Sequence, residues 1–145
     1  MKISTKGRYA LRMLTDLAAH QDDSFVSLKD VAQRQNISKK YLEQIVPMLN
    51  SSGLVRTTRG NRGGYMLARS AREITVGDVL RAAEGTLSPV SCLEHMPNDC
   101  QRAGSCATLF VWEGLYKTVT EYLDSITLQD IADRIAPSDG SDYCI

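Results

Sequence analysis

Residues 54–68, LVRTTRGNRGGYMLA, contain the feature that most restricts how this chain can fold. Two short runs, Leu54–Thr58 and Tyr65–Ala68, have the composition of β-strands, and the glycine-rich segment Arg59–Gly64 lies between them. Two such runs joined by a glycine-containing turn predict a β-hairpin. What the hairpin means depends on the helices predicted before it.

Three helices are predicted ahead of the hairpin. The first covers residues 5–20, where apolar side chains recur at helical spacing. The second begins at Ser27, has Asp30 as a further capping group and ends near Gln35. The turn at residues 36–37 leads into the third helix.

The third helix begins at the capping residue Ser38. Its apolar residues recur at i, i+3, i+4 and i+7, as Leu42, Ile45, Val46 and Leu49. Pro47 lies inside this pattern and removes a backbone hydrogen bond, so we expect the helix to bend or loosen after Val46. Gly53 is a suitable stop. Together the helices and the hairpin predict a winged helix-turn-helix.

The second helix of a helix-turn-helix lies in the major groove of DNA, with its N-terminal residues foremost. Here the core pattern leaves four polar side chains on the outer face: Lys39, Lys40, Glu43 and Gln44. Gln and Glu can bond base edges, whereas lysine and serine more often contact phosphate. The wing tip adds Arg59, Asn61 and Arg62, and arginine there can enter a narrow minor groove. The alternative is a plain surface helix beside a generic hairpin.

The charge of the chain is divided between its two halves. Residues 1–69 carry twelve Lys and Arg against five Asp and Glu, a balance of +7, and residues 70–145 carry five against twelve, a balance of −7. Such polarity suggests that the first half faces a polyanion. The alternative is chance clustering of solvated charges.

The second half is predicted to contain three more helices. Residues 75–85 repeat the capping pattern and end at a glycine, residues 106–123 form a long helix, and residues 127–135 form a short one. The long helix carries Trp112 in an apolar stripe. We expect this stripe to pack on a partner in a homodimer, the alternative being packing within one chain.

The loop before the long helix holds three of the four cysteines: Cys92, Cys100 and Cys106. The first helix carries scattered basic residues with no apolar segment behind them, and no run of about 20 apolar residues occurs, so we expect neither a secretory leader nor a membrane span. The expected location is therefore cytoplasmic. In that compartment a cysteine cluster more often holds metal or performs redox chemistry than forms structural disulfides.

Four segments together resemble the bacterial Rrf2 family of winged-helix transcription regulators: KGRYALRMLTDLA, SLKDVAQRQNISKKYLEQIV, GLVRTTRGNRGGYML and ITVGDVLRAAEG. The resemblance covers about residues 1–136. It implies a homodimer joined by the long helix, a palindromic operator on double-stranded DNA, and an iron–sulfur cluster held by Cys92, Cys100 and Cys106. Carried over by position, it also implies DNA contacts from Ser38, Lys40, Tyr41, Glu43, Gln44 and Arg59.

Two departures from the family pattern leave the cluster type, 2Fe–2S or 4Fe–4S, and its fourth ligand open. The cysteine spacing is C-x7-C-x5-C, whose first gap is longer than in the enterobacterial members. Leu109 stands where some members have a ligand histidine, and Arg8 where others have a carboxylate. The remaining candidates in the loop are His95, Glu94 and Asp99, with Cys144 in the tail as a remote one.

Other uses of the cysteines are chemically sound. Clusters normally have four thiolate ligands, and one with three is easier to lose or attack, which suits a sensor. Three cysteines with His95 could instead bind zinc, although no C-x2-C pair is present. A cluster-free thiol switch is the third reading. An enzyme is not expected, because no nucleophile–base pair, phosphate loop or paired carboxylates occur.

The sequence thus predicts a mainly α-helical fold with a small β-hairpin wing. We expect a winged-helix DNA-binding domain over residues 1–85, a cluster-binding loop over 86–106, a dimerisation helix and a short helix over 107–136, and a flexible tail over 137–145. The expected function is transcription regulation, as a repressor, of iron–sulfur biogenesis or iron and stress genes, in response to cluster status, iron, or nitric oxide and redox stress. The alternative is a cluster-free or zinc-containing regulator controlled by a protein partner or thiol oxidation.

Overall fold

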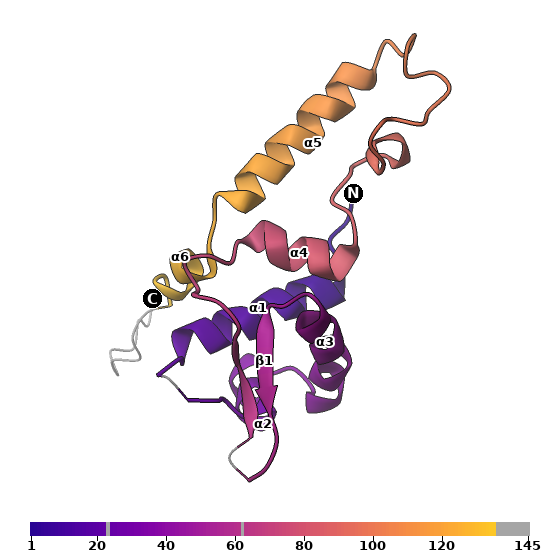
Figure 1. Ribbon diagram of the computed structural model, residues 1–145. Helices are drawn as coiled ribbons and strands as arrows, with labels where there is room; N and C mark the ends of the chain where they lie inside the picture. The colour runs from indigo at the N-terminus through magenta and orange to yellow at the C-terminus, as the bar shows by residue number, and fades with distance from the viewer. Residues whose placement is uncertain (23, 62, 136–145) are drawn as a thin grey trace.

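The computed structural model describes residues 1–22, 24–61 and 63–135. Its elements follow in the order α1 (Thr5–Ala19), α2 (Leu28–Gln35), α3 (Lys39–Ser51), β1 (Val55–Thr58), β2 (Gly64–Leu67), α4 (Val76–Glu84), the 3-10 turn η1 (Ser91–Leu93), α5 (Leu109–Asp124) and α6 (Leu128–Ala132). Figure 1 shows α1 to α4, the hairpin and α6 in one body, from which α5 extends away. The predicted tail over 137–145, including Cys144, lies outside the described residues.

Five of the helices begin at a serine or threonine whose side chain accepts a hydrogen bond from a backbone N–H three residues later. These residues are Ser4, Ser27, Ser38, Thr75 and Thr127. At Thr75 and Thr127 the aspartate three residues later also accepts a hydrogen bond from the backbone N–H of the threonine, so both helices start with a complete capping box. Helix α2 ends at Asn36, which adopts the left-handed conformation that closes many helices. These caps confirm the predicted helix starts.

Helix α3 does not loosen at Pro47. It continues to Ser51, so the predicted interruption after Val46 is wrong. The proline removes the N–H that would bond the carbonyl of Glu43. Both residues lie on the exposed face of the helix, where water can reach that carbonyl. The missing bond therefore leaves no buried polar group.

Two other boundaries differ from the prediction by more than one residue. Helix α5 begins at Leu109, so Cys106 belongs to the preceding loop instead of the helix. Successive turns at residues 100–105 precede it, with hydrogen bonds from Ala103 N–H to the Cys100 carbonyl and from Ser105 N–H to the Arg102 carbonyl. Helix α6 ends at Ala132, short of the predicted residue 135.

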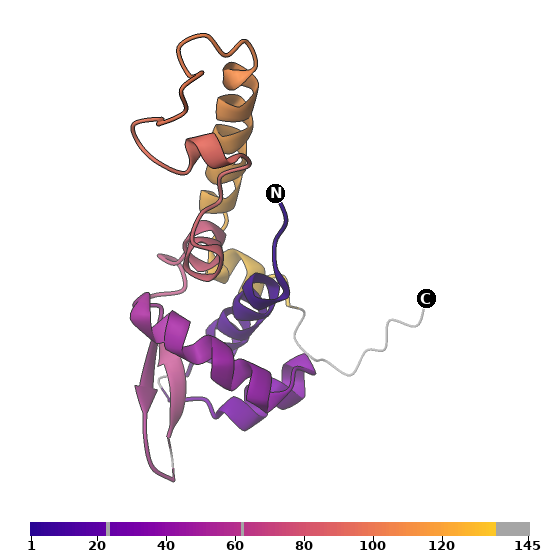
Figure 2. The same ribbon diagram turned by 90° about the vertical axis from the view of Figure 1, so that its right-hand side faces the viewer.

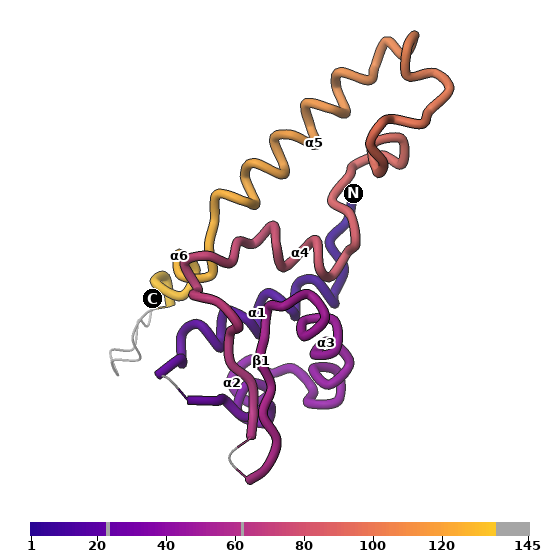
Figure 3. Tube along the Cα trace, viewed as in Figure 1, coloured from indigo at the N-terminus to yellow at the C-terminus, as the bar shows by residue number. Residues whose placement is uncertain are grey.

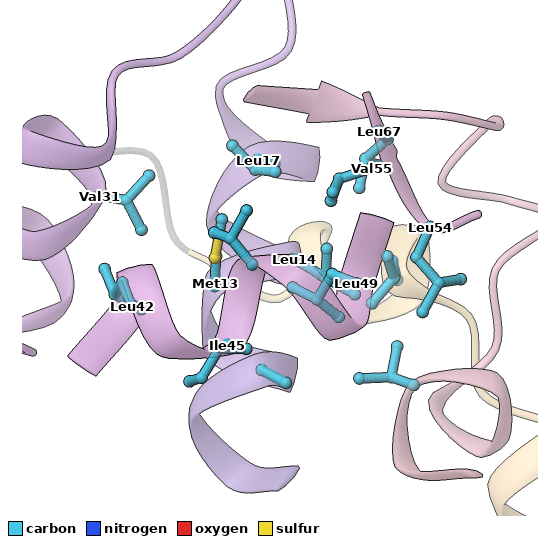
Figure 4. Packing of buried hydrophobic residues seen from close by; sticks show 14 of the residues in the cluster. Met13, Leu14, Leu17, Val31, Leu42, Ile45, Leu49, Leu54, Val55 and Leu67 are labelled. Carbon is cyan, nitrogen blue, oxygen red and sulfur yellow. The ribbon is translucent and has the colours of Figure 1, made fainter. Parts of the chain in front are cut away.

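The main core lies between α1, α2, α3 and the hairpin. Figure 4 shows its apolar side chains converging: Met13, Leu14 and Leu17 from α1, Val31 from α2, Leu42, Ile45 and Leu49 from α3, and Leu54, Val55 and Leu67 from the hairpin. Leu128 of α6 is fully buried in the same cluster. Helix α6 is therefore packed into the same body as α1 to α4.

Figure 3 shows the chain leaving α4, passing through residues 86–108 and returning along α5. Tyr116, Leu123 and Ile126 pack with the buried side chains of Val76, Leu80 and Leu87 at the base of this excursion. Within the described part of the chain, no helix combines the length and apolarity needed to cross a membrane.

An ion pair between a buried carboxylate and an exposed arginine joins α1 to the end of α2. The Asp16 side chain is fully buried, and its two carboxylate oxygens each lie 2.9 Å from Nε of Arg34. The hydrogen bond that Arg34 donates to Asp16 raises the pKa of Arg34 above its ordinary value. Gln35 also donates to Asp16, at 3.4 Å. Because α2 leads directly into the turn before α3, this pair helps to set where α3 lies.

Arg34→Ala should lower the free energy of unfolding by about 3 kcal/mol, because it leaves the fully buried Asp16 carboxylate without its charged partner. Urea denaturation of the purified protein measures this change. Asp22→Ala is the control, since it removes an exposed carboxylate whose recorded side-chain bond is to Ser24, and it should change stability by less than about 0.5 kcal/mol. Equal losses in the two variants would contradict the role given to the pair of Asp16 and Arg34.

Candidate DNA-binding surface and cysteine loop

The outer face of α3 is polar and exposed, as predicted. Lys39, Lys40, Glu43 and Gln44 are all exposed on it. Lys39 Nζ lies 3.7 Å from Oε1 of Glu43, in a weak surface ion pair that a phosphate or a base could replace. The Ser38 hydroxyl accepts from the Tyr41 N–H, so this serine starts the helix as well as lying at its exposed end. These side chains form the edge of the body that a major groove would meet.

Tyr41 has a packing role beside its predicted DNA contact. The residue is half-buried, and its ring meets Tyr9 of α1 edge-on, with 5.3 Å between ring centroids. The guanidinium of Arg12 lies over the other ring of the pair, 5.3 Å from the centroid of Tyr9. Tyr41 therefore holds the start of α3 against α1.

Strands β1 and β2 pair antiparallel and form the predicted wing, with Val55 opposite Leu67 and Thr58 opposite Gly64. Arg59 and Asn61 are exposed at its tip, and Arg62 lies outside the described residues. Gly60 has a φ of +111°, which side chains rarely adopt. A Cβ on Gly63 would lie 2.7 Å from the Thr58 carbonyl oxygen. The two glycines therefore permit the tight turn that presents Arg59.

A backbone bridge fixes the wing to the helix-turn-helix. Val26 and Tyr65 exchange two N–H···O hydrogen bonds, each 2.8 Å long. A Cβ on Gly64 would collide with the Val26 carbonyl, so this glycine is needed for the bridge and not for an approach to DNA. The bridge orients the wing relative to the start of α2.

Arg56 is a candidate contact that the sequence argument missed. It is exposed on β1, and its Nη2 lies 3.5 Å from the sulfur of Met66 on the paired strand. The sequence signal that points to it is the alternation of buried and exposed residues along a strand.

The three predicted cluster ligands lie in one loop between α4 and α5. Cys92 sits in η1 and is half-buried, Cys100 is exposed, and Cys106 is half-buried three residues before α5. All three are free thiols. Figure 2 shows this loop running beside the outer half of α5, away from the DNA-binding body. Leu93 is its buried anchor.

The surroundings of Cys106 favour its thiolate form. A hydrogen bond with the Thr108 hydroxyl, 3.5 Å from the sulfur, lowers the pKa of Cys106, and the backbone N–H groups of Thr108 and Leu109 and the charge of Arg102 act in the same direction. A lowered pKa favours the thiolate, which is the form that binds metals and reacts with oxidants.

The donor set fits an iron–sulfur cluster in its chemistry, because it supplies three thiols and adds Glu94, His95 and Asp99 as oxygen or nitrogen donors. The positions of these donors in the structure do not form a cluster site. Within residues 1–22, 24–61 and 63–135, no three Cys, His, Asp or Glu side chains are grouped closely enough to hold a metal ion. The loop would have to close around a cluster to ligate it.

One face of α5 is apolar and uncovered. None of the residues of α5, all of which are described, is buried. Phe110, Val111, Trp112, Leu115 and Tyr122 are all exposed, Phe110 by 73%. Apolar side chains on one long helix at this exposure are typical of a surface that meets a partner.

The body with a recognition helix and a wing defines a winged-helix DNA-binding protein. The family described as "Rrf2: Iron-dependent Transcriptional regulator" matches residues 3–134. Protein rrf2 of Nitratidesulfovibrio vulgaris is 44% identical over 131 residues, which make up 90% of this chain and 87% of that protein.

Two solved structures are similar along nearly their whole length. One is CymR (YrzC), the global cysteine regulator of B. subtilis, with a TM-score of 0.77 and 40% identity over 94% of this chain and 99% of that one. The other is T. potens IscR, with a TM-score of 0.73 and 40% identity over 94% and 93%. The chain belongs to the Rrf2 family of transcriptional regulators. The predicted fold class and the expectation that it is not an enzyme are thereby confirmed.

Arg59→Ala should weaken binding of operator DNA about tenfold and reduce the slope of log affinity against log salt by about 0.9, the change expected for one lost phosphate contact. Fluorescence anisotropy at several salt concentrations measures both quantities. Arg72→Ala removes an exposed arginine outside α3 and the wing and should leave both unchanged. Equal affinity and slope in Arg59→Ala and the wild type would remove the wing tip from the contact surface.

Proposed function

We propose that this protein is a homodimeric transcription regulator whose binding to a palindromic operator follows the state of an iron–sulfur cluster. The observation that carries the proposal is the location of three free thiols in one loop that directly connects α4 of the DNA-binding body to α5. No structural role in the fold explains these cysteines, because the loop is anchored by Leu93 and Leu87 instead.

The ligands would be Cys92, Cys100 and Cys106, with one of His95, Glu94 or Asp99 as the fourth. When bound, a cluster would supply a redox-active and readily lost group that reports iron supply, nitric oxide or oxidants. Ligation by the three thiols would draw the loop over residues 86–108 together, and loss of the cluster would release it. The loop would then have two arrangements between which a signal could select.

In a homodimer, movement of the cysteine loop could change the affinity for DNA. We propose that the face of α5 formed by Val111, Trp112, Leu115 and Tyr122 packs on the same face of a second copy. Such an isologous contact places two recognition helices on one duplex, with half-sites about one helical turn apart. A change at the outer half of α5 then alters the separation of the two helices and the affinity for the operator.

A cluster-free thiol switch is the second candidate. It is favoured by the lowered pKa of Cys106 and by the exposure of Cys100, and the three thiols are not gathered as ligands in the described structure. The similarity to the cysteine regulator of B. subtilis supports the same reading. In this case oxidation within the loop, or a protein partner, would supply the signal.

Protein purified without oxygen should contain iron and sulfide in near-equal amounts, and Cys100→Ser should lose both while remaining a dimer. Metal and sulfide analysis with an absorption spectrum measures the cluster and separates two-iron from four-iron forms. Ser105→Ala, which changes an exposed residue of the same loop that is not a candidate ligand, is the control and should retain the cluster. Colourless protein, or protein with zinc alone after reconstitution, would exclude the cluster and leave the thiol or partner mechanism.

Leu115→Glu should raise the dissociation constant of the dimer about 100-fold or more, because it places an unpaired charge in an apolar contact. Analytical ultracentrifugation over a concentration series measures the association. Lys117→Glu is the control: it changes a charge at an exposed position of the same helix but outside the apolar face, and it should remain dimeric. A dimer of unchanged affinity in Leu115→Glu would show that α5 is not the interface.

A further inference from the structure

The joint between α5 and the DNA-binding body is built around one carboxylate. Asp124, the last residue of α5, receives a hydrogen bond from Nη2 of Arg81, 2.6 Å from Oδ1, and a longer one from Nη1 to Oδ2, at 3.4 Å. The Thr75 hydroxyl donates to Oδ1 at 3.4 Å. Both partners belong to α4, Thr75 as its cap and Arg81 in its body. The end of the long helix is thus held at two points of the neighbouring helix.

Gly77 shows how closely the two elements meet. A Cβ at this position would collide with Oδ1 of Asp124 and lie 2.9 Å from Nη2 of Arg81. Glycine is otherwise unfavourable inside a helix, by about 1 kcal/mol relative to alanine. Its presence in α4, at a buried position with an ordinary helical conformation, is explained by the space that the carboxylate occupies.

Backbone bonds continue the joint into α6. The N–H of Val76 donates to the Ile126 carbonyl at 2.8 Å, and the N–H of Leu128 donates to the Ile74 carbonyl at 2.9 Å. Thr75 and Thr127, the caps of α4 and α6, face each other across this bridge. The base of α5 is therefore attached to the body by directional bonds, whereas no residue of α5 itself is buried.

We propose that the clamp formed by Asp124, Arg81 and Gly77 sets the angle of α5 on the DNA-binding body and so determines which half-site spacing the dimer recognises. This inference rests on the proposed homodimer. Asp124 and Arg81 are positioning residues, because they act through α5 and the body and do not themselves contact DNA.

The dimensions of the helix make this angle important. The 16 residues of α5 span about 24 Å at 1.5 Å per residue. A tilt of about 10° at the base displaces the far end by about 4 Å, which is close to the 3.4 Å rise of one base pair. One inserted base pair also rotates a half-site by about 34° about the duplex axis, since about 10.5 base pairs make one turn. A joint held at one angle therefore disfavours operators whose spacing differs by one base pair, and a loosened joint tolerates them better.

If the Asp124–Arg81 pair served only to stabilise the fold, its loss would lower stability and leave the preference for half-site spacing unchanged. The side chains of Arg81 and Asp124 are 39% and 38% exposed, and ion pairs at such exposure contribute little to the free energy of folding. Loss of the clamp should accordingly leave the protein folded and dimeric. Its effect should be on spacing discrimination, which a purely stabilising contact would not change.

The test uses the wild-type protein and a palindromic duplex obtained by selection with that protein. Two further duplexes carry one base pair inserted or removed between the half-sites. The wild type should bind these two at least about tenfold more weakly than the selected duplex. Asp124→Ala should reduce this ratio to within about threefold, mainly by loss of affinity for the selected duplex. Gly77→Ala displaces the carboxylate from the opposite side and should have the same effect.

Glu121→Ala is the matched control, because it removes an ion pair with Lys117 that lies within α5 alone; its spacing ratio should equal that of the wild type. If Asp124→Ala loses the dimer, Asp124→Asn, which keeps the shape of the side chain, is measured in its place with the same expectation. A folded, dimeric clamp variant with the wild-type ratio would overturn the inference and leave the dimer standing. A wild type that shows no preference for spacing at all would overturn the proposed dimer on a palindrome, and the inference with it.

Discussion

Helix α1 is the element on which the DNA-binding body assembles, since α2, α3, α4, α6 and β2 all pack against it. Its inner face supplies fully buried side chains to the core, and the same helix carries the buried carboxylate that holds the end of α2. Because α2 leads directly into the turn before α3, that contact also helps to determine where α3 lies. The exposed polar face of α3 is thus positioned by residues in the interior of the protein, which meet neither solvent nor DNA.

Helix α5 is attached in a different way. Directional bonds and the partly buried side chains of Tyr116 and Leu123 hold its base to the body, while no residue of the helix is fully buried and one face is apolar and exposed. Burial of apolar surface is the main favourable term in protein association. A helix that is rigid at one end, carries a cysteine loop at the other and lacks a partner for its apolar face is suited to transmit a change in that loop to a neighbouring subunit.

The candidate sites differed in how far the sequence could predict them. The exposed face of α3 was predicted well, because the spacing of Leu42 and Ile45 determines which residues point outward. For the cysteine loop, the sequence identifies the donor residues but does not predict their positions relative to one another, because no local pattern determines how a loop folds back on itself. Cys106 was placed in the helix because the apolar pattern of α5 carries no signal for the turns that precede Leu109.

The sequence by itself determined the order and the starts of the helices, the hairpin and the division of charge, since capping bonds and periodicity act between residues a few positions apart. Pro47 was misread because the cost of a proline depends on whether the freed carbonyl is exposed, which only packing decides. The tertiary structure alone decided the bridge of Val26 to Tyr65, the pairing of Asp16 with Arg34 and the clamp of Asp124 on Arg81. Each of these joins residues from different elements, and such a pair leaves no local pattern because its geometry exists only once the helices have packed.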